Sequence, residues 1–190
     1  QAMLWNTPGL EIVLPSSPAD VKGLLLSAVR SDNPTVFVDH GGLFSIRGEV
    51  PDDADVVPLG KADVKRSGKD VTVVATSYMV QRSLKVAEEL AAEGIDVEVV
   101  DLRTLVPLDT ETIYASVGKT GRLVIVDETH LSCGVASEIA ARVAEDAFDA
   151  LRGPIRRVCT EDVPIPFPPW LEDEISPNEA KIRAAVKAAV

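Results

Sequence analysis

Short apolar runs that alternate with helical patterns constrain the fold of this chain more than any other feature. The expected strands cover residues 71–75, 97–100, 123–127 and 155–159, and helical patterns separate them. Strands that alternate with helices form a mostly parallel sheet with helices on both faces. The sequence therefore predicts an α/β fold, a three-layer α/β/α domain with about five strands. Residues 62–65 supply the remaining strand at an edge.

The helices of this domain are predicted from apolar residues spaced three and four apart. Gly94 fits the end of the first helix, because a left-handed glycine commonly follows a helix. Asp109 is placed to cap the second. The predicted helices cover residues 78–93, 110–118 and 135–151, and a last one begins near Pro177.

Composition supports an aliphatic core and excludes some partners. Hydrophobic residues make up 46% of the chain and aromatic residues only 4%, which suits parallel strands rich in Val, Ile and Leu. Nineteen Lys and Arg against thirty Asp and Glu give a net charge of −11. Such a surface repels nucleic acid and anionic membranes, so we expect neither as a partner.

A strand–helix–strand unit precedes the domain. Residues 10–14 and 35–39 read as strands, and a helix between them begins at Pro18 and runs to about Arg30. Proline suits the first helical position. Two strands and one helix bury too little surface to fold alone, so we expect the rest of their sheet to come from elsewhere. Residues 41–60 are rich in Gly, Pro and Asp and are predicted to be a linker.

A polar cluster follows the strand 123–127. One hypothesis is a nucleophile, Ser132 or Cys133, with His130 as its base, and another is a metal site formed by Asp127, Glu128 and His130. The structural alternative is a strand-to-helix loop in which Ser132 caps and Gly134 allows close packing.

Two weaker signals have structural interpretations. Cys133 and Cys159 lack metal-ligand or disulfide spacing, so we expect both to be buried as small hydrophobic residues. His40 is followed by Gly41-Gly42 but by no complete phosphate-binding motif, so a loop is the default interpretation.

The stretch DLRTLVPLD, residues 101–109, follows the strand 97–100. It places Asp101 and Arg103 at the carboxyl end of that strand, where α/β sheets commonly meet ligands and partners. Glu128 ends a strand that we expect to be adjacent. These charges predict either a structural ion pair or a role in an interface or cofactor site.

Several segments together carry a resemblance to a known family. PLGKADV, GIDVEVVDLRTLVPLDTETI, TGRLVIVDE and RVCTEDVPIPF occur in that order. They resemble the C-terminal part of the beta subunit of thiamine-diphosphate-dependent 2-oxo acid dehydrogenases, which include the pyruvate, branched-chain and acetoin complexes. Transketolase and deoxyxylulose-phosphate synthase share the last domain, but their linkers match less well.

The resemblance implies a division of the chain and of the chemistry. Residues 1–40 would be the tail of a pyrimidine-binding domain, 41–60 the linker, and 61–190 a transketolase C-terminal domain. The family's cofactor-binding and catalytic residues lie upstream, and the partner alpha subunit holds the diphosphate and magnesium. We therefore expect a C-terminal fragment without catalytic or cofactor-binding residues of its own, which is inactive alone.

One family metal site is partly represented. The resemblance implies a potassium ion held by backbone carbonyls of Ala28, Val29 and Asn33 and by the side chain at Ser31. The family often has Asp where Ser31 stands, and a hydroxyl is a weaker ligand for a hard cation than a carboxylate.

The resemblance also implies partners. These are an alpha subunit, a second beta subunit and a lipoyl acyltransferase, in bacterial cytoplasm or in an organelle matrix. Arg152, before Gly153-Pro154, reverses an acidic charge that some members use for docking, and the acidic run 172–174 is a hypothetical substitute. The expected interface residues are Asp101, Arg103, Glu128, Arg152, Glu172 and Asp173.

The resemblance implies that the chain supports two reactions of the complex: the oxidative decarboxylation of a 2-oxo acid and the transfer of the acyl group to a lipoyl group. The chain would contribute subunit assembly and acyltransferase docking. Two alternatives stay open: another transketolase-type enzyme, such as a ketol transferase or deoxyxylulose-phosphate synthase, and a free-standing binding module without catalysis.

Overall fold

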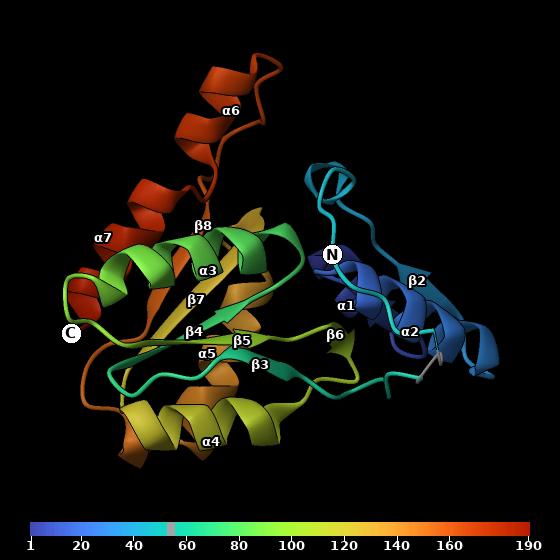
Figure 1. The fold of residues 1–190 in the computed structure, drawn as a ribbon, viewed down its shortest axis with the longest axis horizontal. Helices are drawn as coiled ribbons and strands as arrows, with labels where there is room; N and C mark the ends of the chain where they lie inside the picture. Colours follow the sequence, from blue (N-terminus) through green and yellow to red (C-terminus); the bar gives the residue numbers. More distant parts are fainter. Residues whose placement is uncertain (53–55) are drawn as a thin grey trace.

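The computed structural model describes residues 1–52 and 56–190, and within them the strands form two sheets (Figure 1). Residues 53–55 of the predicted linker lie outside the described residues. The larger sheet has the spatial order β3 (Asp63–Arg66), β5 (Val97–Asp101), β4 (Val71–Ala75), β7 (Leu123–His130), β8 (Arg156–Thr160). Only β3 is antiparallel to its neighbour. The predicted mostly parallel, five-stranded sheet is confirmed.

Helices cover both faces of this sheet, as the alternation of elements predicts. Val74 and Ile125 face one helical layer, whereas Val73 and Val124 face the other, and all four are buried. Because both faces are covered, the central strands β4, β5 and β7 carry apolar residues on both faces and do not alternate strictly with polar ones. One layer contains α4 (Thr110–Thr120) and α5 (Val135–Asp146), and the other contains α3 (Tyr78–Ala91) and α7 (Glu179–Ala189).

The smaller sheet belongs to the N-terminal unit but is completed by the C-terminal domain. Its order is β2 (Thr35–Phe37), β1 (Glu11–Val13), β6 (Thr104–Val106), and α2 (Pro18–Arg30) connects β1 to β2. β1 is parallel to β2, as predicted for a strand–helix–strand unit, and antiparallel to β6. β6 was not expected from the sequence.

Local signals explain where the helices begin and end. The Ser17 side chain accepts a hydrogen bond from Asp20 N at 3.3 Å and caps α2, which begins with Pro18. Asp109 caps α4 in the same way through Thr112 N at 3.1 Å, as predicted. Gly121 ends α4 with φ of 74°, a conformation that favours glycine.

Some expectations were wrong. The predicted helix 135–151 ends at Asp146 and is followed by the short turn η2 (Phe148–Ala150), and the strand expected at 123–127 continues to His130. Cys159 is buried as expected, but Cys133 is exposed. Three short helices were also missed: α1 (Ala2–Trp5), η1 (Gly41–Leu43) and α6 (Pro169–Ile175).

Candidate functional site

The stretch 101–109 crosses from one sheet to the other. Asp101 ends β5 of the large sheet, and Thr104 begins β6 of the small one. Between them Arg103 has φ of 58°, and its carbonyl accepts a hydrogen bond from Leu14 N at 2.7 Å. This sharp turn lets three residues join the N-terminal unit as a strand. The stretch is therefore a covalent and hydrogen-bonded joint between the two parts.

A network of charges surrounds the joint. Asp20 of α2 forms ion pairs with Arg103 Nη2 and with Lys65 Nζ, each at 2.7 Å. Asp63 contacts the same two cations at 3.0 and 2.8 Å. Ser16 Oγ donates to Asp101 Oδ2 at 2.5 Å. We call this set the junction network; its members are Ser16, Asp20, Asp63, Lys65, Asp101 and Arg103.

The pKa values of the two buried acids, Asp20 and Asp101, shift in opposite directions. Burial raises the pKa of Asp20, but hydrogen bonds from Lys65 and Ser17 outweigh it, so the pKa is lowered. Asp101 is fully buried, and this desolvation raises its pKa to about 6 despite the bond from Ser16. Each carboxylate already has partners within the chain. The network thus has the properties of a structural ion cluster.

The expected pairing of Arg103 with Glu128 is wrong. β4 lies between β5 and β7, so the strands that carry these residues are not neighbours. Glu128 Oε1 instead lies 2.9 Å from Nε2 of His40. The assignment of Asp101, Arg103 and Glu128 to an interface between chains stays a prediction.

His40 and Glu128 form part of a second polar region. The ring of His40 stacks on Tyr78, with centroids 4.9 Å apart and an angle of 12°. The Arg82 guanidinium lies 5.3 Å from the Tyr78 centroid on α3 and reaches Asp173 at 3.1 Å. These groups line a cleft of about 180 Å³. We call it the carboxyl-edge cleft; its lining includes His40, Tyr78, Arg82, Glu128, Glu172 and Asp173.

The cleft brings together three predicted interface residues, Glu128, Glu172 and Asp173. The hydrogen bond to Glu128 raises the pKa of His40, against the opposing effect of burial. Both side chains remain about one-third exposed, at 32% and 29%. His40 was predicted only as part of a loop, because its partners Glu128 and Tyr78 lie on other elements. The cleft therefore presents partly exposed charged side chains that are available for contact with another molecule.

The cluster after β7 does not form the hypothesised nucleophile site. Ser132 Oγ donates to Asp162 at 2.7 Å, while His130 Nε2 lies 3.1 Å from the Val163 carbonyl oxygen. Gly134 rather than Ser132 caps α5, and a Cβ there would lie 2.1 Å from the His130 carbonyl oxygen. Close packing at Gly134 is therefore the alternative that the structure supports.

No described residues form a group of three or more His, Cys, Asp or Glu side chains placed to hold a metal ion. The residues predicted for potassium lie at the end of α2. Ser31 N donates to the Ala28 carbonyl at 3.3 Å, and Ser31 Oγ accepts from Asn33 N at 3.2 Å. Val29 is exposed in the last turn. These oxygens are the hard ligands that potassium requires, and its binding here stays a prediction.

Arg152 lies far from the acidic residues that were expected to replace its docking charge. It precedes the amino end of β8, and its amide donates to the Gly121 carbonyl at 2.7 Å. Glu172 and Asp173 belong to α6, which stands beyond the carboxyl end of β8 in Figure 1. Within one chain, Arg152 and the acidic run therefore cannot form one continuous surface.

Comparison with known proteins decides the family. The sequence profile described as "Transketolase, C-terminal domain" matches residues 60–182. The chain belongs to this family. The match begins just before β3 and ends within α7, so it covers the three-layer domain.

Relatives extend the likeness to the N-terminal unit. The beta subunit of acetoin:2,6-dichlorophenolindophenol oxidoreductase from Cupriavidus necator is 49% identical over 97% of this chain and 55% of its own length. The corresponding Bacillus subtilis subunit is 46% identical over 95% and 53%. The pyruvate dehydrogenase E1 component subunit beta of B. subtilis is 45% identical over 88% and 52%. The chain thus spans about half the length of these relatives, and the suspected resemblance is confirmed.

A solved structure supports the same fold. A protein described as a split gene transketolase, in an inactive beta4 tetramer, matches with a TM-score of 0.78 and 27% identity. The match covers 99% of this chain and 59% of that one. The junction between the two parts is therefore a feature of a fold found elsewhere. No helix in the described ranges is long and apolar enough to cross a membrane.

Proposed function

We propose that this chain serves as the C-terminal part of a beta subunit in a thiamine-diphosphate-dependent dehydrogenase that acts on acetoin or a 2-oxo acid. The observation that carries the proposal is 49% identity to an acetoin oxidoreductase beta subunit over both the N-terminal unit and the domain. Identity to the transketolase is much lower, at 27%, which makes a ketol transferase the weaker alternative.

The residues at the carboxyl edge of the large sheet do not fit the cofactor's diphosphate. Asp101 and Asp127 are buried carboxylates whose partners are Ser16 and Thr76 in the same chain. Anionic groups at these positions repel a diphosphate, and their hydrogen bonds leave no donor set directed outward. We therefore assign thiamine diphosphate and magnesium to other parts of the assembly and no catalytic step to these residues.

The role of the chain in this proposal is assembly. The junction network fixes the N-terminal unit against the domain, and the carboxyl-edge cleft offers Glu128, Glu172 and Asp173 to partners. An alpha subunit, a second beta subunit and a lipoyl acyltransferase are the proposed partners, in bacterial cytoplasm. Acidic docking residues suit a basic partner, which the net charge of −11 also favours.

A chimera tests this function. The matching segment of the B. subtilis acetoin oxidoreductase beta subunit is replaced by this chain, and the assembled enzyme is assayed for acetoin-dependent reduction of dichlorophenolindophenol. We expect substantial activity. The control chimera carries the corresponding segment of the split gene transketolase and should be inactive. A chimera with this chain that assembles but reduces no dye would contradict the proposal, as would dye reduction by this chain alone.

A further inference from the structure

The two ring nitrogens of His40 have different hydrogen-bond partners. Gly42 N donates to Nδ1 at 3.0 Å, and Nε2 lies 2.9 Å from Glu128 Oε1. A backbone N–H can only donate, so Nδ1 is the unprotonated nitrogen of the ring. The proton of the neutral ring therefore lies on Nε2, which donates to the Glu128 carboxylate. These two contacts together select one neutral tautomer of His40.

The bond to Nδ1 attaches the start of the linker to the C-terminal domain. Through this bond His40 caps η1, the turn Gly41–Leu43 that follows β2. Gly42 also approaches the stacked rings closely: a Cβ there would lie 3.0 Å from His40 Nδ1 and 3.3 Å from Tyr78 Cε1. The turn therefore covers one edge of the His40–Tyr78 pair, which lines the carboxyl-edge cleft.

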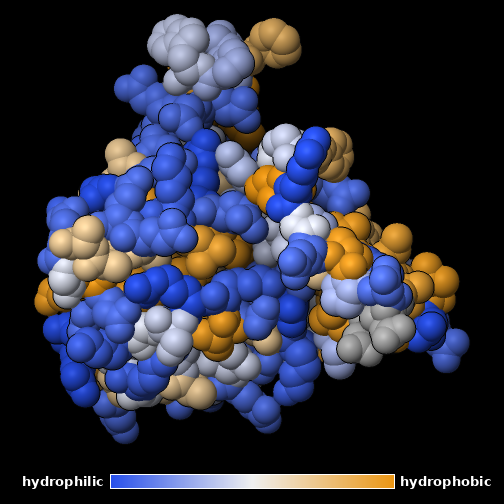
Figure 2. Space-filling view, viewed as in Figure 1, coloured by the Kyte–Doolittle hydropathy of each residue, from blue (hydrophilic) through white to orange (hydrophobic). Residues whose placement is uncertain are grey.

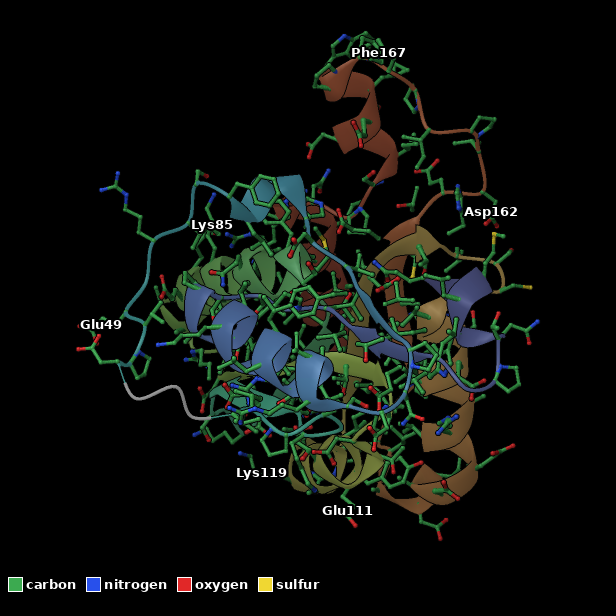
Figure 3. The ribbon with its side chains drawn as sticks, turned by 90° about the vertical axis from the view of Figure 1, so that its right-hand side faces the viewer. Glu49, Lys85, Glu111, Lys119, Asp162 and Phe167 are labelled. Atoms are coloured by element: carbon green, nitrogen blue, oxygen red, sulfur yellow. The ribbon has the colours of Figure 1, made fainter. Side chains whose placement is uncertain are left out.

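The turn is loosely packed against the N-terminal unit. A hollow of about 140 Å³ is lined by Leu43 and Phe44 together with Pro18 and Val21 of α2. Phe44 is 78% exposed, and Figure 2 shows apolar side chains at the surface where η1 lies. Beyond the turn, the linker extends outward towards Glu49 in Figure 3. Segments with few packed contacts open at a low free energy, so the bond to His40 contributes much of what holds this turn.

Protonation of His40 affects its two partners in opposite ways. A proton added to Nδ1 removes the acceptor for Gly42 N and places two N–H groups 3.0 Å apart, facing each other. The contact with Glu128 is strengthened at the same time, because it becomes a charge-assisted hydrogen bond. The protonated ring therefore stays with Glu128 and loses Gly42.

We infer that His40 is a pH-dependent switch, which holds the turn Gly41–Leu43 against Tyr78 while the ring is neutral and releases it when Nδ1 is protonated. Release uncovers the edge of the His40–Tyr78 pair and widens the carboxyl-edge cleft. The inference goes beyond the proposed function and does not depend on it.

Neighbouring charges set the pH at which the turn is released. These are the adjacent Asp39 and, from the elements packed against the ring, Arg82, Glu128, Glu172 and Asp173. The hydrogen bond with Glu128 raises the pKa of His40 above 6.5, against the effects of burial and of Arg82. Release is therefore expected in the near-neutral range. As pH falls through the pKa, the released state gains population by up to about tenfold per pH unit, because one proton is bound.

NMR of the ¹⁵N-labelled chain tests the inference between about pH 5 and 8, where histidine titrates. The neutral ring should carry its proton on Nε2. As His40 becomes protonated, order parameters of the Gly42 and Leu43 amides should fall below about 0.6, the range of a flexible backbone. The Val38 amide, which donates to the Val13 carbonyl at 2.8 Å, is the control and should stay rigid. A neutral ring protonated on Nδ1 overturns the inference, and so do Gly42 order parameters that stay constant through the titration.

Two substitutions separate the roles of the ring nitrogens. In His40→Asn, the side-chain oxygen replaces Nδ1 as the acceptor for Gly42 N and does not titrate, so the turn should stay ordered at every pH. In His40→Gln, the amide nitrogen keeps a donor for Glu128 but no acceptor replaces Nδ1, so the turn should be mobile at every pH. His40 is partly exposed, so both variants should fold, which circular dichroism checks. A turn that still responds to pH in His40→Asn, or stays ordered in His40→Gln, overturns the inference.

Discussion

The junction network and the carboxyl-edge cleft both connect the N-terminal unit to the C-terminal domain, but they differ in burial. Asp20 and Asp101 in the network are at most 1% exposed, and each has several partners. His40 and Glu128 in the cleft remain about one-third exposed. Buried charges held by several partners fix one geometry, whereas exposed charges can exchange partners with little penalty. We therefore infer that the junction network stabilises the fold, whereas the carboxyl-edge cleft is available for contact with other molecules.

The largest expected effect comes from the network. Asp20→Asn leaves Arg103 and Lys65 facing a neutral amide, and removing one partner of a buried ion pair destabilises by about 3 kcal/mol. Glu138→Gln removes a surface pair with Arg142 on α5 and should lower stability by less than about 0.5 kcal/mol. Urea denaturation measures both. Equal losses in the two variants would contradict the distinction between buried and exposed charges.

Asp101 should give the stability a pH dependence. Its pKa rises from 3.8 to about 6 on folding, so the folded state binds more protons between these values. Stability therefore falls as pH rises through this window, by up to about 3 kcal/mol from this group. Asp101→Asn cannot titrate, so the difference between variant and wild type should change across the window. Urea denaturation at several pH values measures the stability of both proteins. A difference in stability between variant and wild type that stays constant across the window would contradict the proposed titration of Asp101.

The smallest effect is expected in the cleft. The pKa of His40 is raised by Glu128, so the stabilisation is present below 6.5 and is lost as pH rises through the folded pKa. Glu128→Gln should return the pKa of His40 towards 6.5 and change stability by less than about 1 kcal/mol. An NMR titration measures the pKa of His40. The chain has two histidines, so the signals that disappear in a His130→Asn variant identify those of His130 and leave those of His40. An unchanged pKa would show that the contact with Glu128 does not hold His40.

Periodic segments of the fold were predictable from sequence, and isolated contacts were not. β4 and α2 were predicted within a residue because a buried apolar run and a Ser-Pro start are local signals. β6 has only three residues between Arg103 and Pro107 and acquires its strand form from β1, so no local pattern marks it. α6 lies in a Pro-rich segment that masked its short helix.

The same holds for the site residues, because their positions in the strands were partly predictable from sequence and their contacts were not. The sequence correctly placed Asp101 at the end of its strand, because strand ends follow from periodicity, whereas β7 continues for two residues beyond Glu128. Their partners could not be inferred, since Ser16 and His40 belong to a distant unit and approach only through the antiparallel pairing of β1 with β6. Arg103 was consequently assigned to Glu128 rather than to Asp20, which lies on α2.

Native-state hydrogen exchange tests the central claim, that the stretch 101–109 joins the N-terminal unit and the domain into one cooperative structure. Exchange is measured at increasing urea for amides of Ile12 and Val13 in β1 and of Val73 and Val74 in β4, all buried. Amides of both strands should exchange with the same opening free energy, equal to that of global unfolding. Exchange of β1 at a clearly lower free energy, with β4 still protected, would contradict it.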